Sequence, residues 1–293
     1  MTTNQQNHRS TSPTATLDIK EEEPRDTRLR HIVVVSHYRE NLEWLWKLPD
    51  NDTIDKIIVY HKGNRLDLIP KLHPLIETRT LPNIGREGHT ILYHLLSEYS
   101  SYTSLDKPTR ITFLQGNPLE HSPRLYDLFR KTGDWKSIQA LGYCFDSMTP
   151  PPKVMKLLPP DYTVLGIDLD ANHHVPVEWT DNGISYLQQK YRKQASYLRE
   201  RVHPYGILMD FMVKSQVYEI LEPILKNYIR GSRVIIPMTY GGLFSVTSDL
   251  ITSNPLELYQ KLYNGLFRSG DNQGGLEGYL LERCWLLIFK HSL

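Results

Sequence analysis

The sequence predicts an α/β protein with a mostly parallel, doubly wound sheet. Three short runs rich in β-branched residues, at 32–35, 56–60 and 111–114, stop at polar residues, which is typical of buried parallel strands. Between the second and third runs, apolar residues from Ile91 to Tyr99 fall on one helical stripe. Strands alternating with helices favour an α/β domain with right-handed crossovers, whose strand ends converge on one crevice.

Shorter elements complete the first half of the chain. A short helix at about 42–46 follows the first strand, and a third strand at 77–81 precedes a glycine-containing turn and the helix from His89. Three tryptophans recur at spacings that fit buried helix faces: Trp44, Trp46 and Trp285.

The second half is less regular because prolines interrupt it. The elements expected there are a strand at 162–167, helices at 182–201 and 217–228, a strand at 234–236, an extended segment after Gly242, and helices at 255–267 and 277–289.

Residues 1–30 have almost no apolar content, and we expect them to form a disordered tail. The remainder, 31–293, is expected to be a single domain with two halves, about 31–150 and about 151–293. Paired glycines at Gly241 and Gly242 would let the backbone pass close to a ligand or to a neighbouring strand.

Length and composition are those of a globular protein with a full core. The 293 residues are 40% hydrophobic, and 34 basic against 33 acidic residues leave a net charge of +1. No global field would therefore recruit nucleic acid or an anionic membrane. No apolar run approaches the roughly 18 residues of a membrane helix, and the two cysteines are too few for a disulfide framework. We expect a cytoplasmic protein without a membrane span.

Amide side chains follow the strand at 111–114. Gln115-Gly116-Asn117-Pro118 ends this strand at the edge where open α/β folds bind ligands. Amides bind hydroxyl groups but are poor sole ligands for Mn²⁺ or Mg²⁺, so a metal is either absent or held by other residues. His121 either contacts a metal or phosphate, or begins the next helix.

The turn Gly85-Arg86-Glu87-Gly88-His89 supports two interpretations. In the first, Arg86 binds a diphosphate or a sugar hydroxyl while helix-terminal N–H groups face the anion. In the second, Glu87 complements a helix N-terminus, Arg86 is solvated and Gly85 serves as a turn.

Asp168-Leu169-Asp170 forms an Asp-x-Asp motif and is followed by His173 and His174. Alternating carboxylates on an extended segment point the same way and suit a divalent cation. The motif lies far beyond the predicted strand ends, however, and acidic residues in such a loop are commonly solvated. Metal dependence therefore stays open, with Asp168 and Asp170 as the candidate ligands.

Glu282 is the first candidate for a general base. It lies within an amphipathic helix and would reach the crevice, or else form an ordinary salt bridge on the helix surface. Asp210 and Glu277 are the rival carboxylates.

Five segments together resemble a family of GT-A-like glycosyltransferases found in fungi and large algal viruses, which includes chlorovirus enzymes that build capsid-protein N-glycans. The segments are Val33 to Leu45, Leu81 to His89, Phe113 to Pro118 with His121, Tyr240 to Val246, and Leu281 to Trp285. The match covers nearly all of 31–290 and runs in order, which makes the resemblance more specific than any one motif.

The resemblance implies transfer of a sugar from a nucleotide-sugar donor to a glycan acceptor, in the host cytoplasm for a viral protein. A UDP-sugar such as UDP-xylose is the first expectation and a GDP-sugar the second. The donor would lie over the first half of the domain and the acceptor over the second. The implied donor residues are His37, Tyr38, Arg39, His61, Lys62, Arg86, Gln115, Asn117 and His121. Tyr240, Gly241 and Gly242 would line the acceptor side, with Glu282 or Asp210 catalytic.

Two other functions fit parts of the sequence. One is a metal-dependent hydrolase built on Asp168, Asp170, His173 and His174. The other is a nucleotide- or glycan-binding module without turnover. In the transferase hypothesis, the reaction is an inverting single displacement in which a base deprotonates the acceptor.

Overall fold

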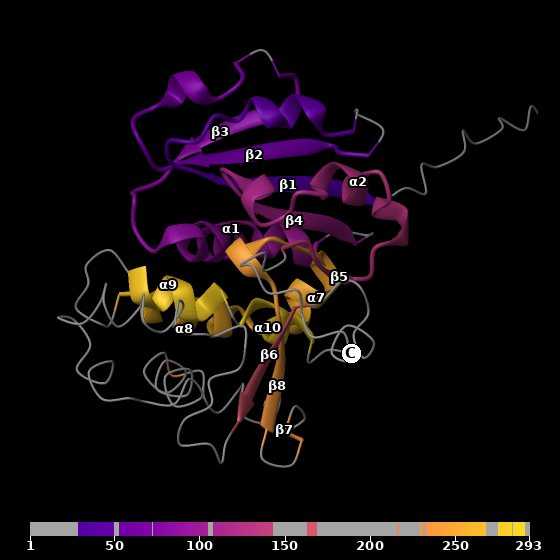
Figure 1. Cartoon of the computed structure of the whole chain (residues 1–293). Coiled ribbons are helices and arrows are strands. Elements are labelled where there is room, and N and C mark those ends of the chain that lie inside the picture. Colours follow the sequence, from indigo (N-terminus) through magenta and orange to yellow (C-terminus); the bar gives the residue numbers. More distant parts are fainter. Residues whose placement is uncertain are drawn as a thin grey trace, which may run out of the picture.

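A computed structural model describes residues 29–49, 53–71, 73–104, 108–142, 163–168, 216, 229–230, 233–267, 275–282 and 284–290. These residues form an α/β structure with a six-stranded sheet of order β3-β2-β1-β4-β9-β5 and a three-stranded sheet of order β6-β8-β7 (Figure 1).

The larger sheet contains β1 (Arg30–His37), β2 (Lys56–His61), β3 (Ile76–Thr80), β4 (Thr109–Gln115), β5 (Ile138–Ala140) and β9 (Phe244–Thr247). The smaller sheet contains β6 (Thr163–Asp168), β7 (Ile229–Arg230) and β8 (Arg233–Met238). The α-helices are α1 (Arg86–Thr103), α2 (Leu125–Phe129), α7 (Ser248–Ser253), α8 (Leu256–Gly265), α9 (Gly275–Glu282) and α10 (Trp285–Lys290). The 3₁₀ turns used below are η1 (Glu43–Lys47), η2 (Leu66–Leu68), η3 (Pro118–Glu120), η4 (Thr132–Asp134) and η7 (Tyr240–Gly242).

Strand β1 is the centre of the parallel part of the sheet. It pairs in parallel with β2 on one side and with β4 on the other, and β3 continues the sheet beyond β2. The chain order therefore reverses between β1 and β4, and such a switch point forms a crevice at the carboxyl ends of the strands. The predicted strands 32–35, 56–60, 77–81 and 111–114 are all confirmed to within a few residues.

The larger sheet is mixed but mostly parallel, as predicted, because one of its six strands runs against the other five. Strand β9 lies between β4 and β5 and is antiparallel to both. Alternating Phe244 and Val246 are fully buried, so the second half of the chain supplies a core strand to the sheet of the first half. The three-residue strand β5 was not predicted, since its run is too short to show a period.

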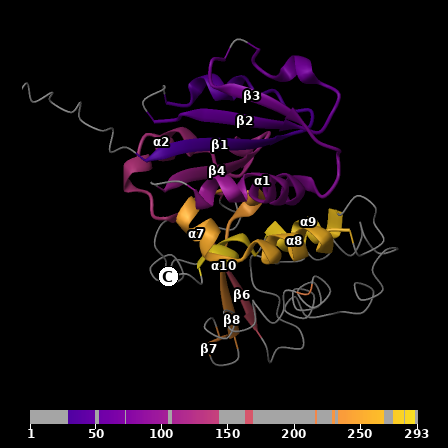
Figure 2. The same ribbon diagram turned by 180° about the vertical axis from the view of Figure 1, so that it is seen from behind.

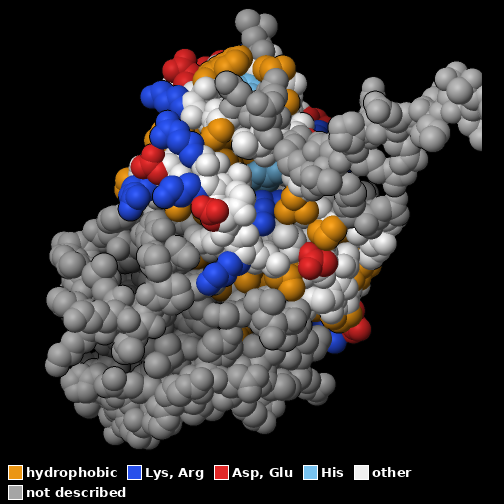
Figure 3. All heavy atoms as spheres, turned by 90° about the vertical axis from the view of Figure 1, so that its right-hand side faces the viewer, with side chains coloured by type: hydrophobic (Ala, Val, Ile, Leu, Met, Phe, Trp, Pro, Cys, Tyr) orange, Lys and Arg blue, Asp and Glu red, His pale blue; other side chains and the backbone are white. Residues whose placement is uncertain are grey.

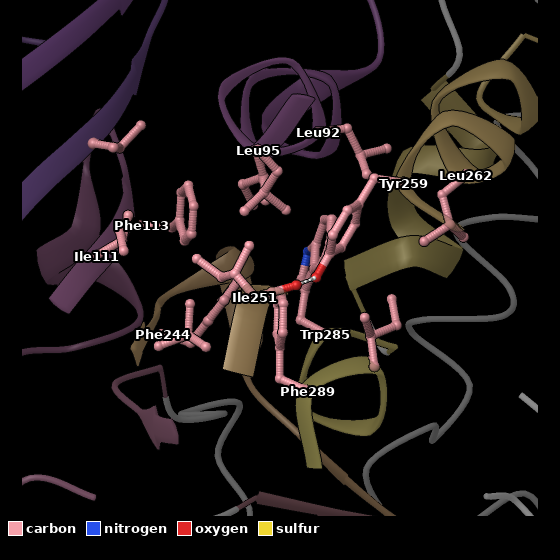
Figure 4. Close-up of a cluster of buried hydrophobic side chains, with 14 of the residues drawn as sticks. Leu92, Leu95, Ile111, Phe113, Phe244, Ile251, Tyr259, Leu262, Trp285 and Phe289 are labelled. Carbon is pink, nitrogen blue, oxygen red and sulfur yellow. Dashed lines mark hydrogen bonds between the residues drawn. The ribbon is translucent and has the colours of Figure 1, made fainter. Parts of the chain in front are cut away.

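The larger core lies between the sheet and α1 together with α7, α8 and α10. Seen from behind, α1 runs along the sheet and the other three helices pack below it (Figure 2). Phe244 is at the centre, with its ring centroid 5.1 Å from Phe113 and 5.6 Å from Trp285. Figure 4 shows these rings between strands and helices, with Leu92, Leu95 and Tyr259 closing the cluster.

The opposite face of the sheet carries a second core. Val33 and Val35 pack there against Leu45, whereas Val34 belongs to the first core, so β1 is buried on both faces as predicted. The expected short helix at 42–46 is the 3₁₀ turn η1. Trp44 and Trp285 are buried, but Trp46 is 52% exposed, so its predicted burial was wrong.

The single helix expected at 277–289 is two helices. Helix α9 ends at Glu282, the N–H of Cys284 donates to the carbonyl of Leu281 at 2.9 Å, and α10 begins at Trp285. The break lets Glu282 leave the apolar stripe while Trp285 remains in the core. Helix α8 confirms the helix predicted at 255–267. Helix α7 was not predicted, because it follows β9 directly.

The smaller sheet confirms the predicted strands at 162–167 and 234–236, as β6 and β8. The expected helices at 182–201 and 217–228, and residues 1–28 of the predicted tail, lie outside the described residues. Within the described part of the chain, every helix is too short or too polar to cross a membrane.

The packing of Phe244 predicts a large loss of stability when this ring is removed. Phe244→Ala should lower the free energy of unfolding by about 3–5 kcal/mol, because the ring is fully buried and touches both the sheet and α10. Urea unfolding measures the change. Leu66→Ala, at a side chain that is 53% exposed, should alter it by less than about 0.5 kcal/mol. Equal effects of the two substitutions would contradict this core assignment.

Candidate functional site

The ends of β1 and β2 bring two histidines together. His37 and His61 are register partners, and their Nδ1 atoms are 2.9 Å apart. Both rings are nearly fully buried, and the Nε2 atom of His37 lies 2.9 Å from the carbonyl oxygen of Glu40. Burial lowers the pKa of the His37 imidazole, so this ring is held neutral.

The loop after β1 folds over the carboxyl edge of the sheet. One carboxylate oxygen of Glu40 accepts hydrogen bonds from the backbone N–H groups of Tyr38 and Arg39, at 2.8 and 3.0 Å. A Cβ on Gly116 would lie 2.3 Å from that same oxygen, so a larger residue after β4 would displace the Glu40 carboxylate. Sequence reasoning missed Glu40, although it belongs to the polar run that follows the first strand.

Lys62 fixes the turn that starts α1. Its buried ammonium donates to the carbonyl oxygens of Ile84 and Arg86, at 2.6 and 2.5 Å. Gly85 and Arg86 both have positive φ, of 61° and 51°. Two successive left-handed residues turn these carbonyls toward Lys62. The backbone strain at Arg86 is offset by the hydrogen bond that its carbonyl accepts from Lys62.

Burial sets the electrostatics of this turn. Burial lowers the pKa of Lys62 to about 8. The Glu87 charge acts to raise this pKa, and the Arg86 charge acts to lower it. Burial and the nearby Lys62 charge together lower the pKa of His89 to about 4. The Arg86 guanidinium Nε lies 3.4 Å from a Glu87 carboxylate oxygen, and Glu87 stands in the first turn of α1 as the second interpretation expects. Binding of an anion by Arg86 stays a prediction.

The glycine turn η7 joins the second half of the chain to the end of β4. A Cβ on Gly241 would lie 3.1 Å from Gln115 and from His121, and Gly241 has a φ of 65°. The Gly241 N–H donates to a carboxylate oxygen of Glu282 at 2.7 Å. An amide from the end of β4, an imidazole from the segment after it and a carboxylate from the end of α9 therefore meet around one glycine.

The remaining predicted residues at this edge have more local roles. The Gln115 side-chain amide donates to the carbonyl of Asn117 at 2.8 Å, which closes the loop after β4. Gly242 stands against Glu87 and Trp285, and so packs η7 on α1 and α10. Tyr240 belongs to η7, and its side chain lies outside the described part.

The candidate metal ligands are remote from this cluster or lie outside the described residues. Strand β6 pairs with β8 so that Thr163 faces Met238, next to η7, while Asp168 faces Arg233 at the far end. The Asp168 backbone is thus roughly 17 Å farther from η7 than the Thr163 backbone, measured along strand β6. Asp170, His173, His174 and Asp210 lie outside the described residues. Among those described, no group of three or more His, Cys, Asp or Glu side chains could hold a metal ion.

The amino edge of the sheet has a different character. A cavity of about 140 Å³ is lined there by Arg30, Lys56, Arg79 and Glu98, with Tyr102 from the end of α1. Arg79 pairs with Glu77 and Glu98, and Lys56 also pairs with Glu77, so most of these charges are neutralised locally. Figure 3 views this edge and shows basic and acidic side chains interspersed on the described surface.

No family model matches the chain, and no curated protein matches it either.

The conformation of Gly241 predicts that a methyl group there disturbs the cluster. Gly241→Ala should lower the free energy of unfolding by about 1–3 kcal/mol, because alanine resists a φ of 65° and its Cβ would press on Gln115. Gly133→Ala is the matched control, since nothing lies within 4 Å of its added Cβ. Chemical denaturation compares the two, and an unperturbed Gly241→Ala protein would contradict this geometry.

Lys62 predicts a specific pH dependence of stability. Its folded-state pKa of about 8 lies below the 10.5 of an exposed lysine, so the unfolded chain binds more protons between these values. Stability from this group should therefore rise with pH above about 8. The difference in unfolding free energy between the native protein and Lys62→Met should shift in favour of the native protein by about 2 kcal/mol from pH 7 to pH 9.5. A constant difference across this range would refute the assignment.

Proposed function

We propose that this protein is a GT-A-like, inverting glycosyltransferase that moves a sugar from a nucleotide-sugar donor to a glycan acceptor in N-glycan synthesis. A UDP-sugar is the favoured donor, with UDP-xylose first, and the reaction takes place in the cytoplasm. One arrangement carries the proposal: Lys62 holds the turn of Arg86, Gln115 and Glu282 lie around Gly241, and the adjacent Gly242 stands against Glu87, so the two groups are neighbours at the carboxyl edge of the sheet. Their chemistry suits a donor with a diphosphate and sugar hydroxyls.

Charge at this edge supports binding of the donor diphosphate. Arg86 opens α1, and the N-terminal N–H groups of an 18-residue helix favour an anion. Lys62 uses two of its three N–H groups to hold the turn, and its charge remains beside the helix start. In the proposal, these groups stabilise the negative charge that develops on the departing nucleoside diphosphate.

The arrangement of Glu282 supports its role as the base. One carboxylate oxygen accepts from the Gly241 N–H, which fixes the carboxylate beside Gln115. In the proposed step, Glu282 takes the proton from an acceptor hydroxyl as that oxygen attacks the anomeric carbon and the bond to the diphosphate breaks. Gln115, Asn117 and His121 would contact the sugar or ribose, and Tyr240 to Gly242 would border the acceptor.

The side chains at the end of β4 do not by themselves fit a divalent cation. Gln115 and Asn117 are amides, whereas Mn²⁺ and Mg²⁺ prefer carboxylate oxygens. The cationic groups Arg86 and Lys62 are the described alternative to a metal. A cation brought by Asp170 would add to this charge, and the assay below includes Mn²⁺ for that reason.

The proposal predicts that Glu282→Gln separates binding from catalysis. The variant should keep the thermal shift given by the donor but lose about 10²–10⁴-fold in kcat, because an amide cannot accept the proton. A panel of UDP-, GDP- and CMP-sugars, with and without Mn²⁺, measures both donor hydrolysis and thermal shift. Glu257→Gln is the control, since this glutamate is exposed and pairs with Lys261 on α8.

Two outcomes would count against this proposal. If no sugar nucleotide gives a thermal shift or hydrolysis in either condition, the transferase assignment fails. If Glu282→Gln turns over normally, the base is Asp210 or Glu277 instead.

A further inference from the structure

The buried histidine pair has a hydrogen-bond order that fixes where its protons lie. The carbonyl oxygen of Glu40 can only accept, so the Nε2 atom of His37 must carry the hydrogen. A neutral His37 then has a bare Nδ1, and the Nδ1 of His61 must donate across the 2.9 Å contact. A neutral imidazole that carries its hydrogen on Nδ1 has no hydrogen on Nε2. A neutral His61 is therefore left with a bare Nε2 that can only accept.

The Nε2 atom of His61 makes no hydrogen bond to another described residue. Thr80, the register partner of His61 in the edge strand β3, is exposed on the same face of the sheet. A ligand would therefore reach the buried His61 ring from the side of Thr80.

An aromatic surface lies next to this acceptor. A Cβ on Gly63 would lie 2.0 Å from the carbonyl oxygen of Tyr38 and 3.0 Å from its ring, so the tyrosine is held directly over Gly63. The guanidinium of Arg39 lies 4.7 Å from the centre of the Tyr38 ring. A flat ring that binds here can stack on the tyrosine or the guanidinium and present its edge to His61.

We propose that His61 reads a ring N–H on the pairing edge of the donor's nucleobase, and that His37 is the positioning residue that fixes its tautomer. Uracil and guanine carry such an N–H, whereas cytosine and adenine place a bare nitrogen at the equivalent position. A bare nitrogen facing the His61 Nε2 leaves two acceptors opposed without a donor. This inference rests on the proposed function, because it treats the bound nucleotide as the sugar donor. Selection of the base can be measured without sugar transfer.

Two measurements test the inference. Long-range ¹H–¹⁵N correlation of the imidazoles should show His61 with its hydrogen on Nδ1, which is the less common tautomer of a free imidazole. Isothermal titration should give UDP and GDP affinities about tenfold or more above those of CDP and ADP. His61→Gln should reduce this preference to nearly one, because its amide can turn to donate or accept. His73→Gln, at a partly exposed histidine whose ring centroid lies 4.5 Å from that of Trp46, should leave the preference unchanged.

Variants at position 37 distinguish a role of His37 in fixing the His61 tautomer from a role in packing alone. His37→Asn keeps an acceptor for the His61 Nδ1–H and should retain both the tautomer and the base preference, whereas His37→Leu should lose both. A wild-type His61 with its hydrogen on Nε2, equal affinity for the four nucleotides, or binding of none would overturn the inference. A preference for UDP and GDP without sugar turnover would support it while the transferase proposal fails, and turnover without base preference would do the reverse.

Discussion

Parallel pairing of β1 with β2 and β4 determines where every group of the candidate site lies. The register sets His37 beside His61 on one side and Ser36 beside Gln115 on the other. Because successive side chains point to opposite faces, a slip of one residue in β1 would send His37 to the opposite face of the sheet, away from His61. Burial of β1 on both faces opposes such a slip, since Val33, Val34 and Val35 fill two separate cores.

The second half of the chain completes this edge through backbone geometry. Strand β9 enters the sheet antiparallel to β4, and η7 before it brings Gly241 and Gly242, both with positive φ, to the end of β4. The helix break after Glu282 then allows its carboxylate to bond the Gly241 N–H. The same short segment therefore anchors the core through Phe244 and positions the candidate base.

The sequence was most informative where apolar runs and helical stripes were long. β1, β2, β4 and α1 have clear periods, so their existence and order could be predicted, and with them the edge where polar side chains gather. The direction and place of β9 could not be predicted, because a four-residue alternating run looks the same in parallel and antiparallel pairing. The bond between Glu282 and Gly241 and the turn held by Lys62 depend on tertiary contacts that no local pattern encodes. Trp46 was wrongly assigned to a buried face because the prediction used the spacing of an α-helix. That spacing does not apply to the 3₁₀ turn η1.

The central claim is that the carboxyl edge of β1, β2 and β4 binds a nucleotide-sugar. Hydrogen exchange of backbone amides, measured with and without a saturating UDP-sugar, tests it most directly. The account predicts slower exchange at 36–41, 61–63, 84–88 and 115–121, with little change at the amino edge around 101–104 and 108–110. Protection confined to the amino edge, or no protection with any nucleotide-sugar of the panel, would contradict it.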